Sequence, residues 1–399
     1  MTRFRPALLL LLALASLHAQ SNSEILQQLS EITGFKIRKP VPQDSMTRDQ
    51  LKAYFNKRLA ETVSPEELRL EELVLKRFGL VPESFDLKQS TLDLMTEQAA
   101  AFYDYRRGRM VILDGQSGFM QNIALIHELA HALADQHFDL DKYIRKNSAG
   151  DDALLARQAV MEGQATWLMS EIMVRRAGQS LRDSPAMVRM MSRMAGEGSG
   201  IFPVFDQSPL YLKESLLFPY AQGMLFQQAI VEKLGGAAFL EVFRKPPLTS
   251  QEILQPERYL QRSASQTVQP YVKPAPPPDP KRWKLLTSGA LGEFDHRILL
   301  RQYDPGRESA AARWTASNYE LHESKKDKSI LLSYASRWES PEAAREIFEG
   351  YKTVLQGKWT RCDFTEETPT RVRGTGGAGL FELTLDRDTV RSLEGLPIN

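Results

Sequence analysis

Apolar residues in the first part of the chain recur at helical spacing, as Ile25 and Leu29 illustrate. Further along, Ser64-Pro65-Glu66-Glu67 has the features of a helix start. The serine can cap the helix, the proline suits the first helical position, and Glu67 completes a capping box. An apolar face follows, and Gly79 ends it. Residues 20–83 are therefore predicted to form a helical N-terminal segment.

The pattern changes near residue 100. Two mostly apolar stretches, residues 101–105 and 110–113, flank the polar turn Arg106-Arg107-Gly108-Arg109, which predicts a β-hairpin. Helical patterns follow at about residues 119–136 and 151–176, and a third runs from about Pro219 to a stop at Gly235-Gly236. Residues 185–200 are rich in methionine and predict an amphipathic element that serves for packing or as a flexible lid.

A run of prolines between Pro270 and Pro280 marks the clearest boundary, and it predicts an extended linker or surface strap. Beyond it, the pattern predicts strands at 317–321, 329–333 and 378–385, the last strand of the chain, and a helix at 341–355. The polar residues 325–328 are expected to form a turn between strands, and residues 374–377 an ordinary loop.

The fold class predicted from these patterns is α+β. A mainly helical core is followed by a small C-terminal α+β domain. The predicted division is as follows: signal peptide 1–19, N-terminal helical segment 20–83, central core 84–266, Pro-rich linker 267–282 and C-terminal α+β domain 283–399.

The first residues have the pattern of a secretory signal peptide. Arg3 and Arg5 precede a mostly apolar run at residues 7–17, which is too short to span a bilayer as a helix. Cleavage is expected after Ala19, with a second option after Ala15. Because of this signal peptide, we expect an exported protein, periplasmic or extracellular. No later apolar stretch is long enough to span a membrane, so no stable membrane span is expected after cleavage. An uncleaved membrane anchor is the alternative.

Charge and cysteine content narrow the range of functions. The 399 residues include 51 Lys+Arg and 50 Asp+Glu, a formal net charge of +1 that creates no field to attract phosphate backbones. We therefore expect no nucleic-acid partner. The single cysteine, Cys362, excludes an intramolecular disulfide and a cysteine-rich metal site, and an ordinary packed thiol is expected.

The segment His127-Glu128-Leu129-Ala130-His131 carries the most informative chemistry. Histidines at positions i and i+4 lie on one face of a helix, so both imidazoles can bind one metal ion, and neutral imidazole is a good zinc ligand. Glu128 lies beside the first ligand, where it can act as general base on a water molecule. The surrounding residues are apolar, which predicts a buried, preorganised helix.

A catalytic zinc site needs a third protein ligand and an open position. His137 has the spacing of one known third ligand, but Ala134 stands where that motif needs a glycine to leave the helix, so His137 is expected to point elsewhere. Glu162 is the preferred candidate, because it is a lone acid on a largely uncharged helix, 31 residues after His131. Gly163 is expected to permit close approach of this helix to the histidine helix.

Through the two histidines and the downstream glutamate, the sequence resembles the zincin metallopeptidases of the gluzincin type. The resemblance implies the metal ligands His127, His131 and Glu162, with Glu128 as catalytic base. It also implies that an edge strand before the histidine helix binds the substrate as an extra strand, a position that residues 102–113 suit.

The chain also resembles a group of secreted bacterial zincin-like proteins. The stretches that carry this likeness span about half the chain: Phe102-Tyr103-Asp104, residues 127–140, Glu162-Gly163, Phe218-Pro219-Tyr220 with Gly223, and residues 246–259.

This sequence departs from the family pattern in two places. Many gluzincins have an acid four residues after the glutamate ligand, where this chain has Thr166, so Asp135 or Asp139 would have to hold a ligand histidine. The bacterial relatives have a histidine at the position of Gln255. If that histidine stabilises an oxyanion, Gln255 does so less well.

An oxyanion-stabilising donor is therefore needed, and Tyr220 and Tyr211 are the candidates, Tyr220 being preferred as a catalytic residue. The competing interpretation for each is a tyrosine packed in the core with its hydroxyl at the rim.

These features predict a secreted zinc metallopeptidase that hydrolyses peptides or proteins through an activated water. The alternative is a non-catalytic secreted binding or scaffold protein that retains a zinc site. Glu128 argues against it, because a structural zinc site needs no base. A zinc hydrolase of non-peptide amides has the same sequence features. Whether residues 20–83 form a removable prosegment stays open.

Overall fold

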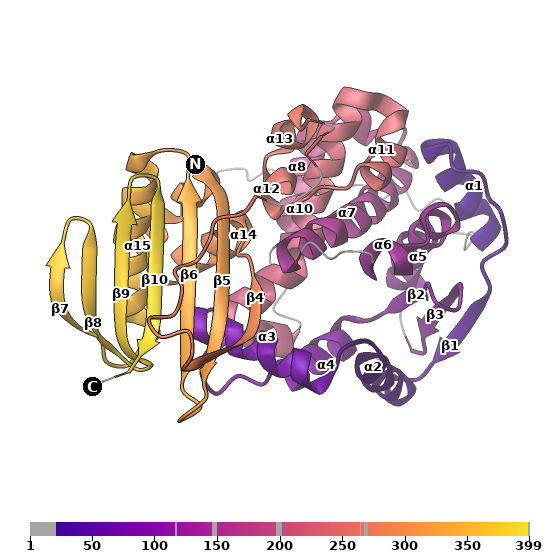
Figure 1. Ribbon diagram of the computed structural model, residues 1–399. Coiled ribbons are helices and arrows are strands. Elements are labelled where there is room, and N and C mark those ends of the chain that lie inside the picture. The colour runs from indigo at the N-terminus through magenta and orange to yellow at the C-terminus, as the bar shows by residue number, and fades with distance from the viewer. Residues whose placement is uncertain are drawn as a thin grey trace, which may run out of the picture.

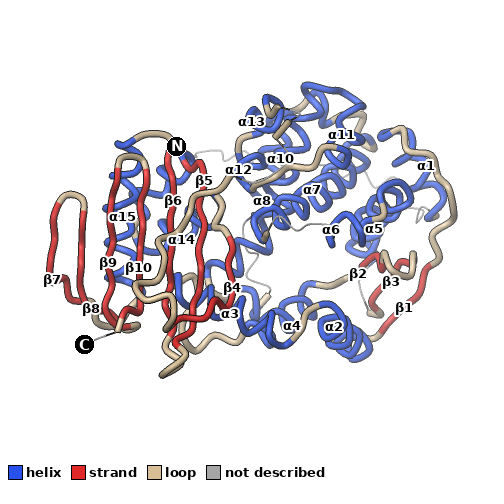
Figure 2. Tube along the Cα trace, in the orientation of Figure 1, coloured by secondary structure: helices blue, strands red, loops and turns tan. Residues whose placement is uncertain are grey.

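A computed structural model describes residues 21–115, 118–145, 150–196, 202–263, 265–266 and 270–397 (Figure 1). The predicted signal peptide, residues 1–19, and part of the predicted linker, residues 267–269, lie outside the described residues. Helices make up most of the structure, and the strands form two separate sheets, so the chain is of the α+β class (Figure 2). None of the helices described is long and apolar enough to cross a membrane.

The N-terminal segment is helical, as predicted, except for one short strand. Its elements are α1 (Asn22–Thr33), β1 (Gln43–Met46), α2 (Arg48–Thr62) and α3 (Pro65–Phe78), and α4 (Leu87–Gln98) follows it. The predicted capping box opens α3: Ser64 Oγ accepts from the backbone N–H of Glu67 (3.1 Å), whose carboxylate accepts from the N–H of Ser64 (2.7 Å). Gly79 ends the helix in the left-handed conformation.

A three-stranded sheet lies beside the histidine helix. The predicted hairpin is present as the antiparallel strands β2 (Ala101–Asp104) and β3 (Arg109–Leu113). The strand order is β1-β3-β2, with β1 parallel to β3. β2 is therefore an edge strand. The sequence pattern did not predict that β1 pairs with the other side of β3.

The helical centre of the molecule surrounds a long pair of helices. Its elements are α5 (Gly118–Phe138), α6 (Leu140–Arg145), α7 (Asp151–Arg175), η1 (Leu181–Asp183), α8 (Pro185–Gly196), α9 (Pro203–Gln207), α10 (Leu210–Leu234), η2 (Gly235–Ala237), α11 (Ala238–Arg244), α12 (Ser250–Leu254) and α13 (Pro256–Gln261). The predicted start of the third helix at Pro219 is wrong, because α10 begins at Leu210 and holds Pro219 in its interior. Proline is most common in the first helical turn, which explains the error.

Two glycines bring α7 and α10 into backbone contact. A Cβ atom added at Gly163 would lie 2.1 Å from the carbonyl carbon of Gly223, and one at Gly223 would lie 2.1 Å from the oxygen of Ala159. Neither position has room for a side chain. The expected role of Gly163 is thereby corrected, since the helix that it brings close is α10 and not the histidine helix.

A seven-stranded antiparallel sheet dominates the C-terminal part, with the order β4-β5-β6-β10-β9-β8-β7. Its elements are β4 (Trp283–Gly289), α14 (Glu293–Tyr303), η3 (Pro305–Arg313), β5 (Trp314–Ser324), β6 (Ile330–Trp338), α15 (Pro341–Lys358), β7 (Asp363–Thr368), β8 (Arg371–Gly376), β9 (Gly379–Asp386) and β10 (Thr389–Leu396). Helix α15 packs on β6, β9 and β10 (Figure 1).

The predicted strands and helix fall on β5, β6, β9 and α15, and residues 325–328 form the predicted turn. Two expectations are wrong: β10 follows the supposed last strand, and residues 374–376 belong to β8 rather than to a loop. Glycine is unfavourable in strands, but Gly374 faces Phe381 and the backbone of Asp363 so closely that a Cβ has no room there.

The Pro-rich segment runs without helix or strand across the sheet. The N–H of Val272 donates to Asn318 Oδ1 on β5 (2.9 Å), and Ser333 on β6 donates to the carbonyl of Ala275. At the opposite side, Phe78 of α3 packs edge-on against Tyr319 and Tyr334. The helical part and the sheet thus share a continuous hydrophobic core.

Candidate metal centre

The histidine pair lies on α5, in a helix whose remaining side chains are largely apolar. Leu129, Ala130 and Leu133 are buried in the core. His127 and His131 are also nearly buried, and their rings lie edge to face, with centroids 4.7 Å apart. One helical turn separates them, which is why both imidazoles reach the same point.

Glu162 of α7 meets both histidines. His127 Nε2 lies 3.0 Å from Glu162 Oε2, His131 Nε2 lies 3.2 Å from that oxygen, and the two Nε2 atoms are 3.0 Å apart. Ligand atoms bound tetrahedrally to one zinc ion are about 3.3 Å apart. The two nitrogens and the carboxylate oxygen therefore fit a single zinc ion. Within the described residues, this is the one group of three or more such side chains whose ligand atoms converge.

The electrostatics of Glu162 follow from its neighbours. Burial alone would raise its pKa, but the charges and hydrogen bonds of His131 and His127 hold the pKa of Glu162 well below its usual range. The carboxylate therefore stays ionised, which is the state that binds a cation.

Glu128 lies next to this group in a different environment. Burial raises the pKa of Glu128 to about 7, with His127 lowering it and the charge of Glu162 raising it. One carboxylate oxygen, Oε2, accepts a hydrogen bond of 2.7 Å from the backbone N–H of Tyr103 on β2. The edge strand thus holds the side chain beside the histidine pair.

Tyr220 of α10 completes the surroundings. Its ring stacks on that of His127, with centroids 5.9 Å apart and the planes inclined by 27°. The nearby charge of Glu162, followed by burial, raises the pKa of Tyr220 well above its ordinary value, so the hydroxyl keeps its proton. A neutral phenol at this place can donate a hydrogen bond to a developing negative oxygen.

The other candidates lie elsewhere. The ring of His137 stacks on Phe35, and its Nε2 lies 2.8 Å from the carbonyl oxygen of Lys36, because α5 continues through Ala134 as expected. Tyr211 donates to Asp295 Oδ1 (3.2 Å) near the other end of α10, so its proposed oxyanion role is not supported by its position.

The expected orienting residues do not contact the histidine ligands. Asp135 accepts from the hydroxyl of Tyr103 (2.8 Å) and from the N–H of Leu140 (2.8 Å), and Asp139 caps Lys142. Gln255 donates to Glu293 Oε2 (2.6 Å) and to the carbonyl of Ala312, in a network with α14.

Sequence reasoning named Tyr103 only as part of a shared stretch and missed its role. Its backbone binds Glu128 and its hydroxyl binds Asp135, so one residue of β2 fixes two positions of α5. Alternation along the hairpin predicts that Tyr103 and Ala101 face the same side, but it does not say which helix covers that side.

Two lesser expectations concern α8 and the single cysteine. Met190 and Met194 are 55% and 67% exposed, whereas Met187 and Met191 pack against the core, so the methionine cluster is divided between packing and an open face. Cys362 is half-buried against the core, as an ordinary packed thiol.

Comparison with known proteins adds no identification. No family model matches the chain, and searches of curated proteins and of solved structures found no significant match. The functional argument consequently depends on the geometry of the His127, His131 and Glu162 group and on the side chains around it.

Proposed function

We propose that this protein is a zinc-dependent peptidase of the gluzincin type, exported from the cell, that hydrolyses peptide bonds through an activated water. One observation carries the proposal: three ligand atoms converge within 3.2 Å of one another, beside the half-buried carboxyl of Glu128, which is not itself one of them. A purely structural zinc site needs no such fourth group, because it fills its positions with protein ligands.

His127, His131 and Glu162 would hold the ion. Zinc bound there supplies Lewis acidity, which lowers the pKa of water and polarises a carbonyl group. Glu128 takes the proton of the attacking water and passes it to the leaving amine. The Tyr220 hydroxyl donates to the carbonyl oxygen as negative charge develops on it.

The substrate peptide would bind along β2. Among the described strands β2 pairs only with β3, so its outer edge has backbone groups that an extended peptide can pair with. The N–H of Tyr103 points to this edge, where it donates to Glu128. A peptide bound in this register therefore lies directly against the general base.

The test compares the wild-type chain with Glu128→Gln. Zinc content is measured by atomic spectroscopy, and hydrolysis of casein and of a quenched peptide library is followed with and without a chelator. We expect one zinc per chain in both proteins, and loss of at least about 100-fold of the activity in Glu128→Gln. Glu257→Gln, an exposed glutamate on α13, is the matched control and should remain active.

The other outcomes separate the alternatives. Zinc without hydrolysis in the wild-type chain would favour the non-catalytic binding protein. Hydrolysis of small amides but not of peptides would favour the amide hydrolase, and a fully active Glu128→Gln variant would refute the role of Glu128. Absence of zinc would contradict the central proposal.

A further inference from the structure

A cavity of about 460 Å³ lies where α3, α4, α7 and α10 meet α14 and β5. Figure 1 shows these helices and the strand. Four carboxyl groups line it: Glu71, Asp151, Asp152 and Asp295. No lysine, arginine or histidine occurs among the described residues of its wall, and none of the four acids forms an ion pair with another described residue. The remaining wall is largely leucine, so the cavity combines uncompensated negative charge with an apolar surface.

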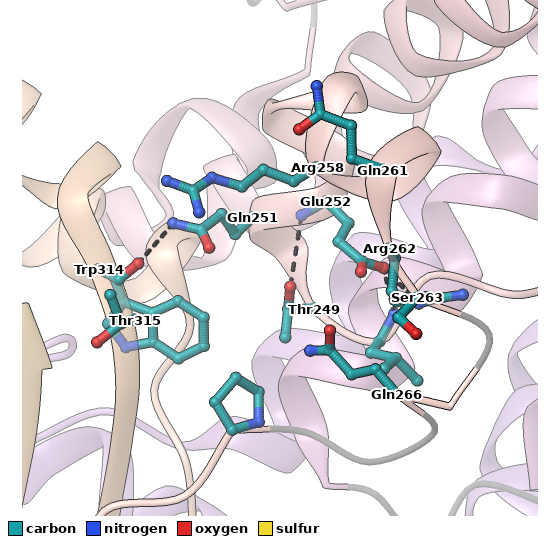
Figure 3. Close-up of a pocket in the computed structure, with 12 residues that line it drawn as sticks. Thr249, Gln251, Glu252, Arg258, Gln261, Arg262, Ser263, Gln266, Trp314 and Thr315 are labelled. Atoms are coloured by element: carbon teal, nitrogen blue, oxygen red, sulfur yellow. Dashed lines mark hydrogen bonds and ion pairs between the residues drawn. The ribbon is translucent and has the colours of Figure 1, made fainter. Parts of the chain in front are cut away.

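In the pocket shown in Figure 3, by contrast, the arginines have ion-pair partners. This pocket of about 330 Å³ lies between α12, α13 and the start of β5. Its two arginines both have carboxylate partners: Arg262 Nη1 lies 2.6 Å from Glu252 Oε2, and Arg258 pairs with Glu339. The protein itself neutralises the charges of that pocket, whereas it leaves those of the acidic cavity without a counterion.

One buried polar atom in the wall of the acidic cavity lacks a partner. Asp152 is 3% exposed, and its Oδ1 atom has no hydrogen-bond partner in the described part of the chain. Tyr319 is 4% exposed and also lines the cavity, and the charges of Asp151, Asp295 and Glu71 act on its hydroxyl. No hydrogen bond of this hydroxyl occurs among the described residues. Buried polar atoms rarely stay unpaired, so Oδ1 of Asp152 indicates a place for a hydrogen-bond donor.

The cavity disfavours the charges of its own acids. Burial and repulsion from Asp151 raise the pKa of Glu71 to about 7. Burial, followed by repulsion from Asp152, raises that of Asp295 to about 7, and burial raises that of Asp152 to about 6. A bound cation would reverse this penalty.

The size of the cavity and the placing of its acids decide between a metal ion and an organic cation. In the described residues, no three carboxylates of the cavity converge closely enough to hold one metal ion. A volume of about 460 Å³ with leucine walls instead suits a molecule with a hydrocarbon body. We infer that this cavity is a binding site for an organic ammonium or guanidinium group carried on an apolar body, separate from the metal centre.

Isothermal titration calorimetry at pH 8 tests the inference with 4-phenylbutylamine as probe and 4-phenylbutanol as its uncharged counterpart. A blocked leucyl-lysine amide forms a second arm, because the same cation could belong to a free amine or to a peptide side chain. The arm with the tighter binding identifies the source. We expect the amine to bind at least about tenfold more tightly than the alcohol, because only the amine can form a charged hydrogen bond to a carboxylate.

Variants locate the site. Glu71→Gln combined with Asp151→Asn should weaken binding at least about tenfold. Both side chains reach water in the cavity and have no hydrogen bond to the described residues, so the fold should be retained, which a thermal melt checks. Glu83→Gln, an exposed glutamate in the loop after α3, is the matched control and should bind normally.

His127→Ala tests whether the probe binds at the proposed metal centre instead. We expect this variant to bind the amine as tightly as the wild-type chain does. Equal affinity for amine and alcohol, unchanged affinity in the double variant, or no binding of either cationic probe would each overturn the inference.

Discussion

Helix α7 carries carboxylates in two opposite electrostatic settings. Glu162 meets two imidazoles, which hold its pKa low, whereas burial, with the charges of nearby acids in addition, raises the pKa of Asp152 at the start of the helix to about 6. About 15 Å of helix separates them. Both groups are largely enclosed by protein, so burial alone does not determine their charge. The charge of each carboxylate also depends on the partners that the fold brings to it.

The helix pair α7 and α10 links the two regions, and breaking its contact should have the largest effect. Gly163→Ala places a methyl group against the backbone of Gly223, which cannot move aside, and Glu162 is the adjacent residue. We expect a loss of at least about 3 kcal/mol in the free energy of unfolding, measured in urea, and reduced zinc content. Gly236→Ala, where the new Cβ meets no atom within 4 Å, should leave both unchanged. A stable, zinc-loaded Gly163→Ala variant would contradict the tight contact.

The candidate metal centre by itself can be tested at Glu162, its proposed acidic ligand. Glu162→Ala should weaken zinc binding by at least about 100-fold, because even the outer partners of metal ligands contribute 10–100-fold. Competition with a chromogenic chelator measures this affinity. His137→Ala is the comparison variant, since His137 contacts Phe35 and Lys36 instead. Zinc loss in His137→Ala with retention in Glu162→Ala would reverse the assignment of the third ligand.

The acidic cavity should make stability fall as pH rises. Asp295 has a pKa raised from 3.8 to about 7, so the folded chain retains a proton that the unfolded chain releases between these values. Its contribution is full below about pH 4 and is lost as pH rises through about 7. Asp295→Asn removes that loss. Between pH 4 and pH 8, the free energy of unfolding of this variant should rise relative to that of the wild-type chain by on the order of 2 kcal/mol.

Urea unfolding at both pH values measures the gain. Asp386→Asn, an exposed residue next to Arg391, should show no such pH dependence. A difference between Asp295→Asn and wild type that stays constant with pH would count against the uncompensated charge.

The smallest effect is expected at the edge strand β2. Tyr103→Phe removes the hydrogen bond to Asp135 but keeps the backbone N–H that binds Glu128. A loss of about 1 kcal/mol in stability is expected, with peptide hydrolysis largely retained. Tyr105→Phe is the control, because its hydroxyl has no hydrogen bond to the described residues. A collapse of activity in Tyr103→Phe would give the hydroxyl a direct role in the reaction.

The candidate metal residues could be predicted because their pattern is local. Two histidines one helical turn apart and a lone acid on the following helix are visible in the sequence, and the structure brings these three side chains together. Their function stays a prediction. Tyr103 could not be assigned in the same way, since its partner depends on which face of the hairpin α5 covers.

The acidic cavity lies beyond such reasoning. Glu71, Asp151 and Asp295 come from three helices that are far apart in the sequence, and each by itself has the pattern of an ordinary surface acid. Only the packing of α3, α7 and α14 places them together. Strand β10 was missed for a related reason, because polar residues and Gly395 interrupt its apolar alternation.

Strand β1 has a consequence for proteolytic maturation. Residues 43–46 pair with β3, and the preceding segment is held to α5 by the two bonds that Arg38 makes to Gln136. Ile25 and Leu29 of α1 are fully buried in the common core. A protease that trimmed the chain within this region would expose an unpaired strand and a hydrophobic surface beside the histidine helix. The segment is therefore an integral part of the folded chain and not a detachable prosegment.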